Sequence, residues 1–278
     1  MRIARTAAVA LLLLTACADA GGAAREAPEP SPPAPSPPTP DDLLLRVEQT
    51  GGFGTPAMLA SRLPLVSVYA DGRMITQGPQ ILSYPPPALP NLQVRRLSRA
   101  DAQAMVERAR AAGIGGPPVD YGHPTVADEP SIRVTVGDDV VEVYALGEEG
   151  GLSADQLRAR RRLRELVSAL TDVAPSGSDA RYEPAAVAAV ATPWRLGEGD
   201  EGLPEPPEVA WPGPDLPGES IGPETGCVVA AEPRAVRDIL AKAAKATSLT
   251  PWRSAGKRWT VALRPLLPDE SGCADLRD

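Results

Sequence analysis

The chain has 278 residues, which is enough for one or two folded domains. Its formal net charge of −8 argues against nucleic acid as a partner, because an acidic protein repels the phosphate backbone. With one histidine and three cysteines, the chain has too few nitrogen and sulfur ligands for a zinc centre, and we expect no metal and no other cofactor.

The first 16 residues have the pattern of an export signal. Arg2 and Arg5 supply a positive start, and an aliphatic run follows from Ala7 to Leu14. The run ends in Leu14-Thr15-Ala16-Cys17, which resembles the lipobox of bacterial lipoproteins. The resemblance implies that Cys17 carries a lipid, becomes the mature N-terminus and anchors the protein to the outer face of the bacterial cell membrane.

Two other fates of this segment stay open. Ala18-Asp19-Ala20 also fits the cleavage site of an ordinary secretory signal. A retained transmembrane helix is the weaker alternative, because about 20 apolar residues are needed to cross a bilayer and this run is shorter. The cysteine at position 17 favours lipidation.

Residues 17–41 predict a linker between the lipid and the folded part. Prolines are dense between Pro28 and Pro40 and alternate with Ser, Ala, Glu and Thr. Such a composition cannot bury a core and favours extended polyproline II, so we expect a disordered stalk. A proline-rich ligand for another domain is the alternative.

Residues 42–174 predict an α+β domain. Alternating apolar residues indicate strands over 43–49, 65–70, 73–76, 92–97, 132–136 and 141–145. The dipeptide Asp71-Gly72 predicts a tight hairpin turn. Ser98 and Ser153 are the predicted N-caps of two amphipathic helices, of which the second ends near Leu170.

Residues 180–278 predict a smaller α+β domain. Strands are expected near 185–194, 227–230 and 258–264. A helix begins at Pro233 and carries the apolar residues Val236, Ile239, Leu240 and Ala243 on one face. Each helix has one apolar stripe, so we expect antiparallel sheets that are each covered by helices, with any ligand site at the junction of the two domains.

Two cysteines remain once Cys17 is assigned to the lipid. In an oxidising compartment, Cys227 and Cys273 are expected to form a disulfide that attaches the C-terminal tail to a strand. The alternative is a pair of free, buried thiols.

All four tryptophans fall in the second predicted domain, where we expect them to build the core. The alternative is a stacking surface for a sugar or a peptide, for which Trp194 and Trp211 are the candidates. They flank or lie in the segment 195–225, which lacks a periodic pattern and is long for a loop without a function.

Motifs for nucleophilic or metal catalysis are absent from the sequence. His123 lies between Gly122 and Pro124, which predicts a surface turn, and neither G-x-S-x-G nor H-E-x-x-H occurs. We therefore assign no catalytic residue. Two alternatives stay open: a calcium ion bound by the acidic loop that includes Glu205 and Glu208, and a hydrolase that uses paired carboxylates.

The predicted helix after Ser153 carries the basic cluster of the chain, which consists of Arg158, Arg160, Arg161, Arg162 and Arg164. We expect these arginines on a solvated face opposite the apolar stripe. The alternative is contact with anionic headgroups or with an acidic partner.

The stretch from Leu45 to Gly54, with its Gly51-Gly52-Phe53-Gly54 turn, resembles the first strand of emfourin-type metalloprotease inhibitors, which are small α+β proteins. This resemblance implies protease inhibition as one function. Without any catalytic motif, we expect a non-catalytic lipoprotein that binds or scaffolds an envelope protein or a glycan. A carboxylate-based envelope hydrolase is the other alternative.

Overall fold

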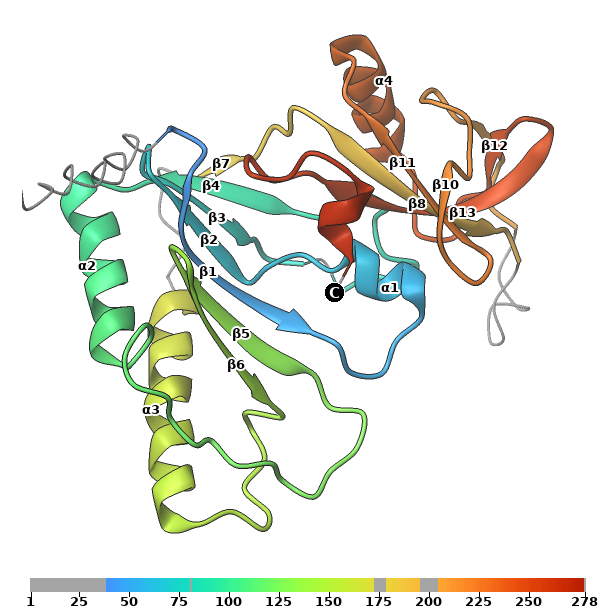
Figure 1. The fold of residues 1–278 in the computed structure, drawn as a ribbon. Helices are drawn as coiled ribbons and strands as arrows, with labels where there is room; N and C mark the ends of the chain where they lie inside the picture. Colours follow the sequence, from blue (N-terminus) through green and yellow to red (C-terminus); the bar gives the residue numbers. More distant parts are fainter. Residues whose placement is uncertain (1–38, 81, 173–178, 196–204, 278) are drawn as a thin grey trace, which may run out of the picture. The chain divides into compact units, whose positions relative to one another are not determined.

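The computed structural model describes residues 39–80, 82–172, 179–195 and 205–277 (Figure 1). The predicted signal peptide, Cys17 and nearly all of the predicted stalk lie outside the described residues. Among the residues that are described, no helix combines the length and the apolar character needed to cross a bilayer.

The first sheet has seven strands in the order β6-β5-β1-β2-β3-β4-β7, and every neighbouring pair is antiparallel. Its strands are β1 (Leu43–Thr50), β2 (Val66–Tyr69), β3 (Arg73–Gln77), β4 (Leu92–Arg96), β5 (Ser131–Val136), β6 (Asp139–Tyr144) and β7 (Ala180–Arg181). The predicted hairpin turn at Asp71-Gly72 joins β2 to β3, and Gly72 has a φ of 84°, which glycine adopts without strain.

Two helices, α2 (Arg99–Ala111) and α3 (Ala154–Thr171), cover one face of this sheet (Figure 1). Both begin where the sequence predicts, because the hydroxyls of Ser98 and Ser153 accept backbone N–H groups of the first turn. Their apolar stripes pack on the inward residues of β1 and β5 in one buried cluster. Each fully buried Leu or Val there contributes about 1.5–3 kcal/mol.

The second sheet has six strands in the order β10-β11-β8-β13-β12-β9. Its strands are β8 (Val187–Pro193), β9 (Val209–Ala210), β10 (Glu219–Gly222), β11 (Thr225–Ala230), β12 (Trp252–Ser254) and β13 (Lys257–Pro265). The pairs are antiparallel except for β9 with β12, which is parallel, so this sheet is mixed.

Both faces of the second sheet are covered at its central strand β8. The helix α4 (Pro233–Ala243) packs on one face, where Val187, Ala189 and Ala191 of β8 share one buried hydrophobic cluster with the helix. On the other face, Ala188 and Val190 pack with α1 (Pro56–Ser61) and with the 3₁₀ helix η1 (Cys273–Leu276). Burial on both faces explains why β8 reads as a continuous apolar run without alternation.

The structure has antiparallel and mixed sheets with few helices, which is an α+β or mostly β fold; the sequence predicted antiparallel sheets, and the parallel pair of β9 with β12 departs from that prediction. The structure also shows contacts between the two predicted domains. The helix α1, from the first predicted domain, packs on the second sheet, and the strand β7, from the second predicted domain, pairs with β4 of the first sheet. The residues from Pro38 onward form one compact unit. The division at 174–180 stays a prediction.

Two expectations about local structure were wrong. The segment 195–225 contains the strands β9 and β10 within its described part. Arg160 is not solvated: it is completely buried, and its guanidinium donates to the carbonyls of Tyr121, Tyr144 and Ala145. Its position on α3 turns it towards these loops, whereas Arg158, Arg161 and Arg162 remain exposed as expected.

Candidate functional site

A groove of about 760 Å³ lies between the edge of the first sheet and helix α4 of the second. Its volume is within the range of roughly 300–1,000 Å³ that is typical of small-molecule sites. The described lining is mostly apolar and consists of Leu89, Pro90, Leu92, Arg181, Tyr182, Glu183, Pro184, Ala185, Ala231, Pro233, Val236, Arg237, Leu240, Ala244 and Pro265. The sequence predicted a ligand site at such a junction.

Helix α4 forms one wall of the groove through a stripe along its whole length. Pro233, Val236, Arg237, Leu240 and Ala244 follow the pattern i, i+3, i+4, i+7 and i+11, and therefore share one side of the helix. The adjacent stripe, with Ile239 and Ala243, is buried against the second sheet. Val236 also belongs to this buried cluster and Leu240 packs against it, so the groove lies directly beside the core contact of α4.

The opposite wall follows β7 and the residues after it. The hydroxyl of Tyr182 donates to the carbonyl of Leu266 at 2.8 Å, which satisfies its polar group and leaves the ring to line the groove. Burial raises the pKa of Tyr182 to about 12, so its hydroxyl stays neutral at physiological pH. The ring of Tyr182 therefore gives this wall an apolar surface that is fixed in place, next to the charged side chains of Arg181 and Glu183.

The segment that carries Leu89 and Pro90 is attached to the end of α4 by backbone hydrogen bonds. The N–H of Ala88 donates to the carbonyl of Ala246 at 3.0 Å, and the N–H of Ser248 donates to the carbonyl of Pro86 at 2.9 Å. These bonds fix the segment that carries Leu89 and Pro90 relative to the C-terminal end of α4.

The described charged lining of the groove consists of Arg181, Arg237 and Glu183, which are all exposed. Neither arginine side chain forms a salt bridge or a hydrogen bond with a described residue. Arg237 lies near Glu232, but that carboxylate caps α4 by accepting the N–H of Ala235 at 2.8 Å. The groove therefore offers two exposed guanidinium groups without a salt bridge to a described residue, of which Arg237 also interacts at longer range with the carboxylate of Glu232.

The two tryptophans considered for a ligand surface lie elsewhere. Trp211 is 9% exposed and packs edge-on against Trp252 at 5.5 Å, with its indole N–H donated to the carbonyl of Pro214. The ring of Trp194 is half-buried, and the guanidinium of Arg258 lies 4.2 Å from its centre. Neither belongs to the described groove lining, and their role in binding stays a prediction.

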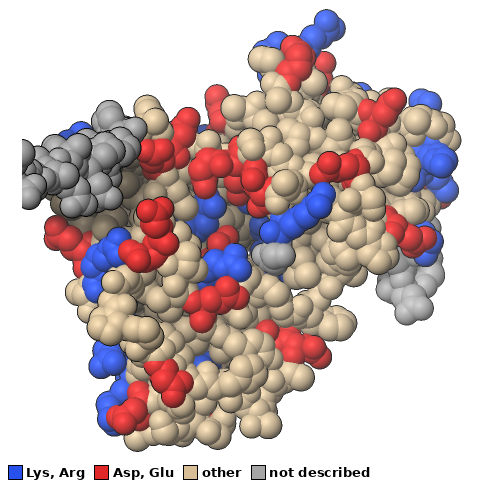
Figure 2. All heavy atoms as spheres, in the orientation of Figure 1, with Lys and Arg blue, Asp and Glu red and all other residues tan. Residues whose placement is uncertain are grey.

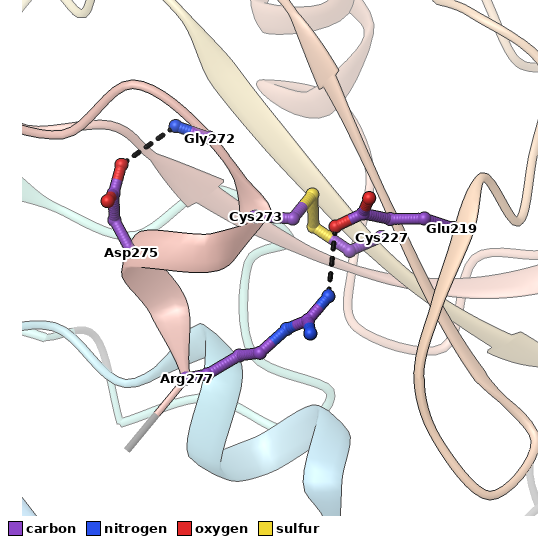
Figure 3. The surroundings of a disulfide bond; sticks show 6 residues. All are labelled: Glu219, Cys227, Gly272, Cys273, Asp275 and Arg277. Atoms are coloured by element: carbon purple, nitrogen blue, oxygen red, sulfur yellow. Dashed lines mark hydrogen bonds and ion pairs between the residues drawn. A yellow bond between two sulfur atoms is a disulfide. The ribbon is translucent and has the colours of Figure 1, made fainter.

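The predicted disulfide is present. Cys227 in β11 and Cys273 at the start of η1 are bonded, with their Cα atoms 6.0 Å apart (Figure 3). Beside it, Arg277 donates to Glu219 of β10 at 3.0 Å, and the N–H of Gly272 donates to Asp275 at 2.9 Å. The C-terminal segment is thereby fixed to the edge of the second sheet.

A second, smaller cavity of about 130 Å³ is polar and arginine-rich. Figure 2 shows charged side chains of both signs gathered over β1 and the C-terminal segment, where this cavity lies. Its arginines are already engaged: Arg46 with Asp269, Arg133 with Glu142, and Arg264 with Glu270. We assign this cluster to the stability of the fold.

Other candidates for chemistry in the described part of the chain are metal ligands, His123 and the residues of the predicted acidic loop. No three His, Cys, Asp or Glu side chains gather there in a way that could hold a metal ion. His123 is exposed and stacks on Tyr144, with ring centres 4.5 Å apart. The acidic loop considered for calcium lies largely outside the described residues, although Glu205 pairs with Arg258 and Glu208 with Arg253.

Sequence reasoning placed Val236 and Leu240 on the apolar face of α4 but did not separate core from groove. The sequence held no signal for this separation, because Val236 and Leu240 line the groove and also pack in or against the core cluster. The other wall comes from β7, whose two residues show no strand pattern.

The chain matches no protein-family model, and comparisons with curated proteins and with solved structures found no similar protein.

Proposed function

We propose that this protein is a lipid-anchored, extracytoplasmic binding protein, and that its ligand occupies the groove between β7 and α4. The groove carries this proposal, because its size, its mostly apolar lining and its fixed walls are the properties of a small-molecule site. The proposed mode of action is non-catalytic: the ligand is held and presented at the membrane, without a chemical step.

Two features support the location. The sequence from Arg2 to Cys17 resembles a lipoprotein signal, and the Cys227–Cys273 disulfide is the kind of bond that persists outside the cytoplasm. These features are independent, because one concerns export and the other the redox environment of the folded part.

A carboxylate-based hydrolase is less well supported at this groove. Glycoside hydrolysis needs two carboxyl groups on either side of the scissile bond, separated by about 5–10 Å. Glu183 is the one carboxylate within the described lining. Hydrolysis would thus need a second carboxyl group in the groove, whereas binding needs none.

Protease inhibition is a second candidate, supported by the exposure of Phe53. Its side chain is 85% exposed in the loop that resembles emfourin-type inhibitors. The loop is held by a hydrogen bond from the N–H of Phe53 to the carbonyl of Asp128 at 2.9 Å, which presents an aromatic group on a fixed backbone. Loss of metalloprotease inhibition in a Phe53→Ala variant would identify this function; no inhibition by the unaltered protein would exclude it.

Binding in the groove is tested with the uncharged fluorescent probe N-phenyl-1-naphthylamine. Ala244 is exposed and lines the groove, so Ala244→Trp should fill the groove and abolish the fluorescence increase. Ala241 is exposed on the same helix outside the described lining, and Ala241→Trp is the matched control. Equal probe binding by both variants would place the site elsewhere.

The anchor is tested by cell fractionation and mass spectrometry. A Cys17→Ser variant should move from the membrane to the soluble extracytoplasmic fraction, because the thioether to the lipid cannot form. Mass spectrometry of the mature unaltered protein should find a lipidated Cys17 at its N-terminus. An unmodified chain that begins after Ala20 would instead establish ordinary secretion.

A further inference from the structure

We infer that the groove binds an amphipathic anion of the fatty-acid class, with its apolar chain along α4 and its carboxylate held by Arg181 and Arg237. This inference rests on the proposed function and specifies its ligand. It follows from three properties of the groove: its length, the composition of its walls and its charge.

The length of the groove fits one acyl chain. The lining residues of α4 extend from Pro233 to Ala244, which at 1.5 Å per residue is about 16 Å. The hydrocarbon core of a bilayer is about 30 Å thick and contains two layers of chains, so one extended acyl chain spans about 15 Å. A compact ligand such as a single sugar ring would use only part of this wall.

The walls suit a chain without polar groups. Leu89, Pro90 and Leu240 contribute partly exposed apolar side chains, and the hydroxyl of Tyr182 is already bonded to Leu266. A sugar in this position would leave its hydroxyls unpaired against apolar walls, and each such group costs about 1–3 kcal/mol in proteins. An alkyl chain gains from the same surface.

The charge of the groove fits an anionic head group. Arg181 comes from β7 and Arg237 from α4, so each wall supplies one guanidinium. The groove also contains Glu183, which leaves an excess of one positive charge in the described lining (two arginines minus one glutamate). Guanidinium groups are weakly hydrated and match the two oxygens of a carboxylate, so they bind this head group without a strong desolvation penalty.

The test compares dodecanoate, dodecanol and dodecyl phosphate as competitors of N-phenyl-1-naphthylamine. The protein is the full chain with Cys17→Ser, which avoids detergent. We expect dodecanoate to bind about tenfold more tightly than dodecanol at pH 7, because its carboxylate accepts charge-assisted hydrogen bonds that a hydroxyl group does not. The double variant Arg181→Gln/Arg237→Gln should lower dodecanoate affinity to that of dodecanol and leave dodecanol unchanged.

The matched control is Arg234→Gln on the same helix. Arg234 is exposed and outside the described lining, so dodecanoate affinity should not change. Equal affinities for dodecanoate and dodecanol, unaffected by the double variant, would refute the inference of an anionic ligand. The proposal of an apolar binding site would still stand in that case. Tighter binding of dodecyl phosphate than of dodecanoate would reassign the head group. Failure of every competitor, with probe binding insensitive to Ala244→Trp, would refute the proposed function itself.

Discussion

Arg264 and Glu270 form an ion pair that is almost completely shielded from water: Nη2 lies 2.7 Å from Oε1, and the two side chains are 3% and 5% exposed. The second carboxylate oxygen accepts the N–H of Leu267 at 2.7 Å, and Nε of Arg264 donates to the carbonyl of Arg62 at 3.1 Å. The pair thus joins β13, the C-terminal segment and the loop after α1.

Breaking this pair should strongly destabilise the protein. Glu270→Gln leaves the guanidinium of Arg264 buried without its counter-ion, which typically costs about 3–5 kcal/mol. The exposed pair of Arg195 with Glu224 is the control, and Arg195→Gln should cost less than about 1 kcal/mol. Urea unfolding of both variants measures the difference, and similar midpoints would show that the buried pair contributes little.

Replacement of Arg160 by lysine should lower the stability of the protein. Its guanidinium donates to the carbonyl of Tyr121 at 3.0 Å and to that of Tyr144 at 2.7 Å, and an ammonium group cannot reach both. A buried carbonyl left without a partner costs about 1–3 kcal/mol, so Arg160→Lys should lower the free energy of unfolding by that amount. Arg161→Lys, an exposed change on the same helix, should have no effect. Equal stability of the two variants would contradict this role.

The disulfide should contribute substantially to stability. Cys227 and Cys273 are separated by 46 residues in the sequence, so the bond restricts a long loop in the unfolded chain. Its removal by Cys227→Ser/Cys273→Ser should cost about 2–5 kcal/mol in urea unfolding. In the Cys17→Ser protein, denatured without reductant, thiol titration should find no free thiol. Two free thiols would refute the bond.

Asp275 should make stability depend on pH in the acid range. Its carboxylate accepts the N–H groups of Ser271 and Gly272 and the hydroxyl of Ser271, which hold its pKa below the usual value. A carboxylate with a lowered pKa stabilises the fold above the unfolded-state pKa of about 3.9, and the contribution is lost as pH falls through the folded-state pKa.

An Asp275→Asn variant should therefore be less stable than the unaltered protein at pH 7, with a deficit that shrinks below about pH 4. Thermal unfolding across pH measures this. The control is Asp215→Asn, since exposed Asp215 makes no hydrogen bond with a described residue and its replacement should cause no such deficit. A pH-independent deficit for Asp275→Asn would contradict the assignment.

The two sheets should stay together after the chain is cut between them. A protease site inserted between Asp172 and Asp179 allows cleavage at the predicted domain boundary. Contacts of α1 with β8 and the backbone bonds of Ala88 and Ser248 cross that boundary, so the fragments should co-elute in gel filtration. They should separate in urea. Separate elution under native conditions would show two independent domains.

The sequence by itself determined the elements whose signals are local. The capping box of Ser153 and Gln156, the turn at Asp71-Gly72 and the first-turn proline at Pro233 depend on neighbours within a few residues, and each lies where it was predicted. The pairing of Cys227 with Cys273 was also predictable, because the assignment of Cys17 left no other partner.

Only the tertiary structure decided what depends on distant partners. The strands β7 and β9 have two residues each, and they exist because β4 and β12 lie beside them. Arg160 is buried because loops far along the sequence place their carbonyls around it. The groove forms because residues of β7 and of α4 line one cavity, and no local pattern in either segment records the position of the other.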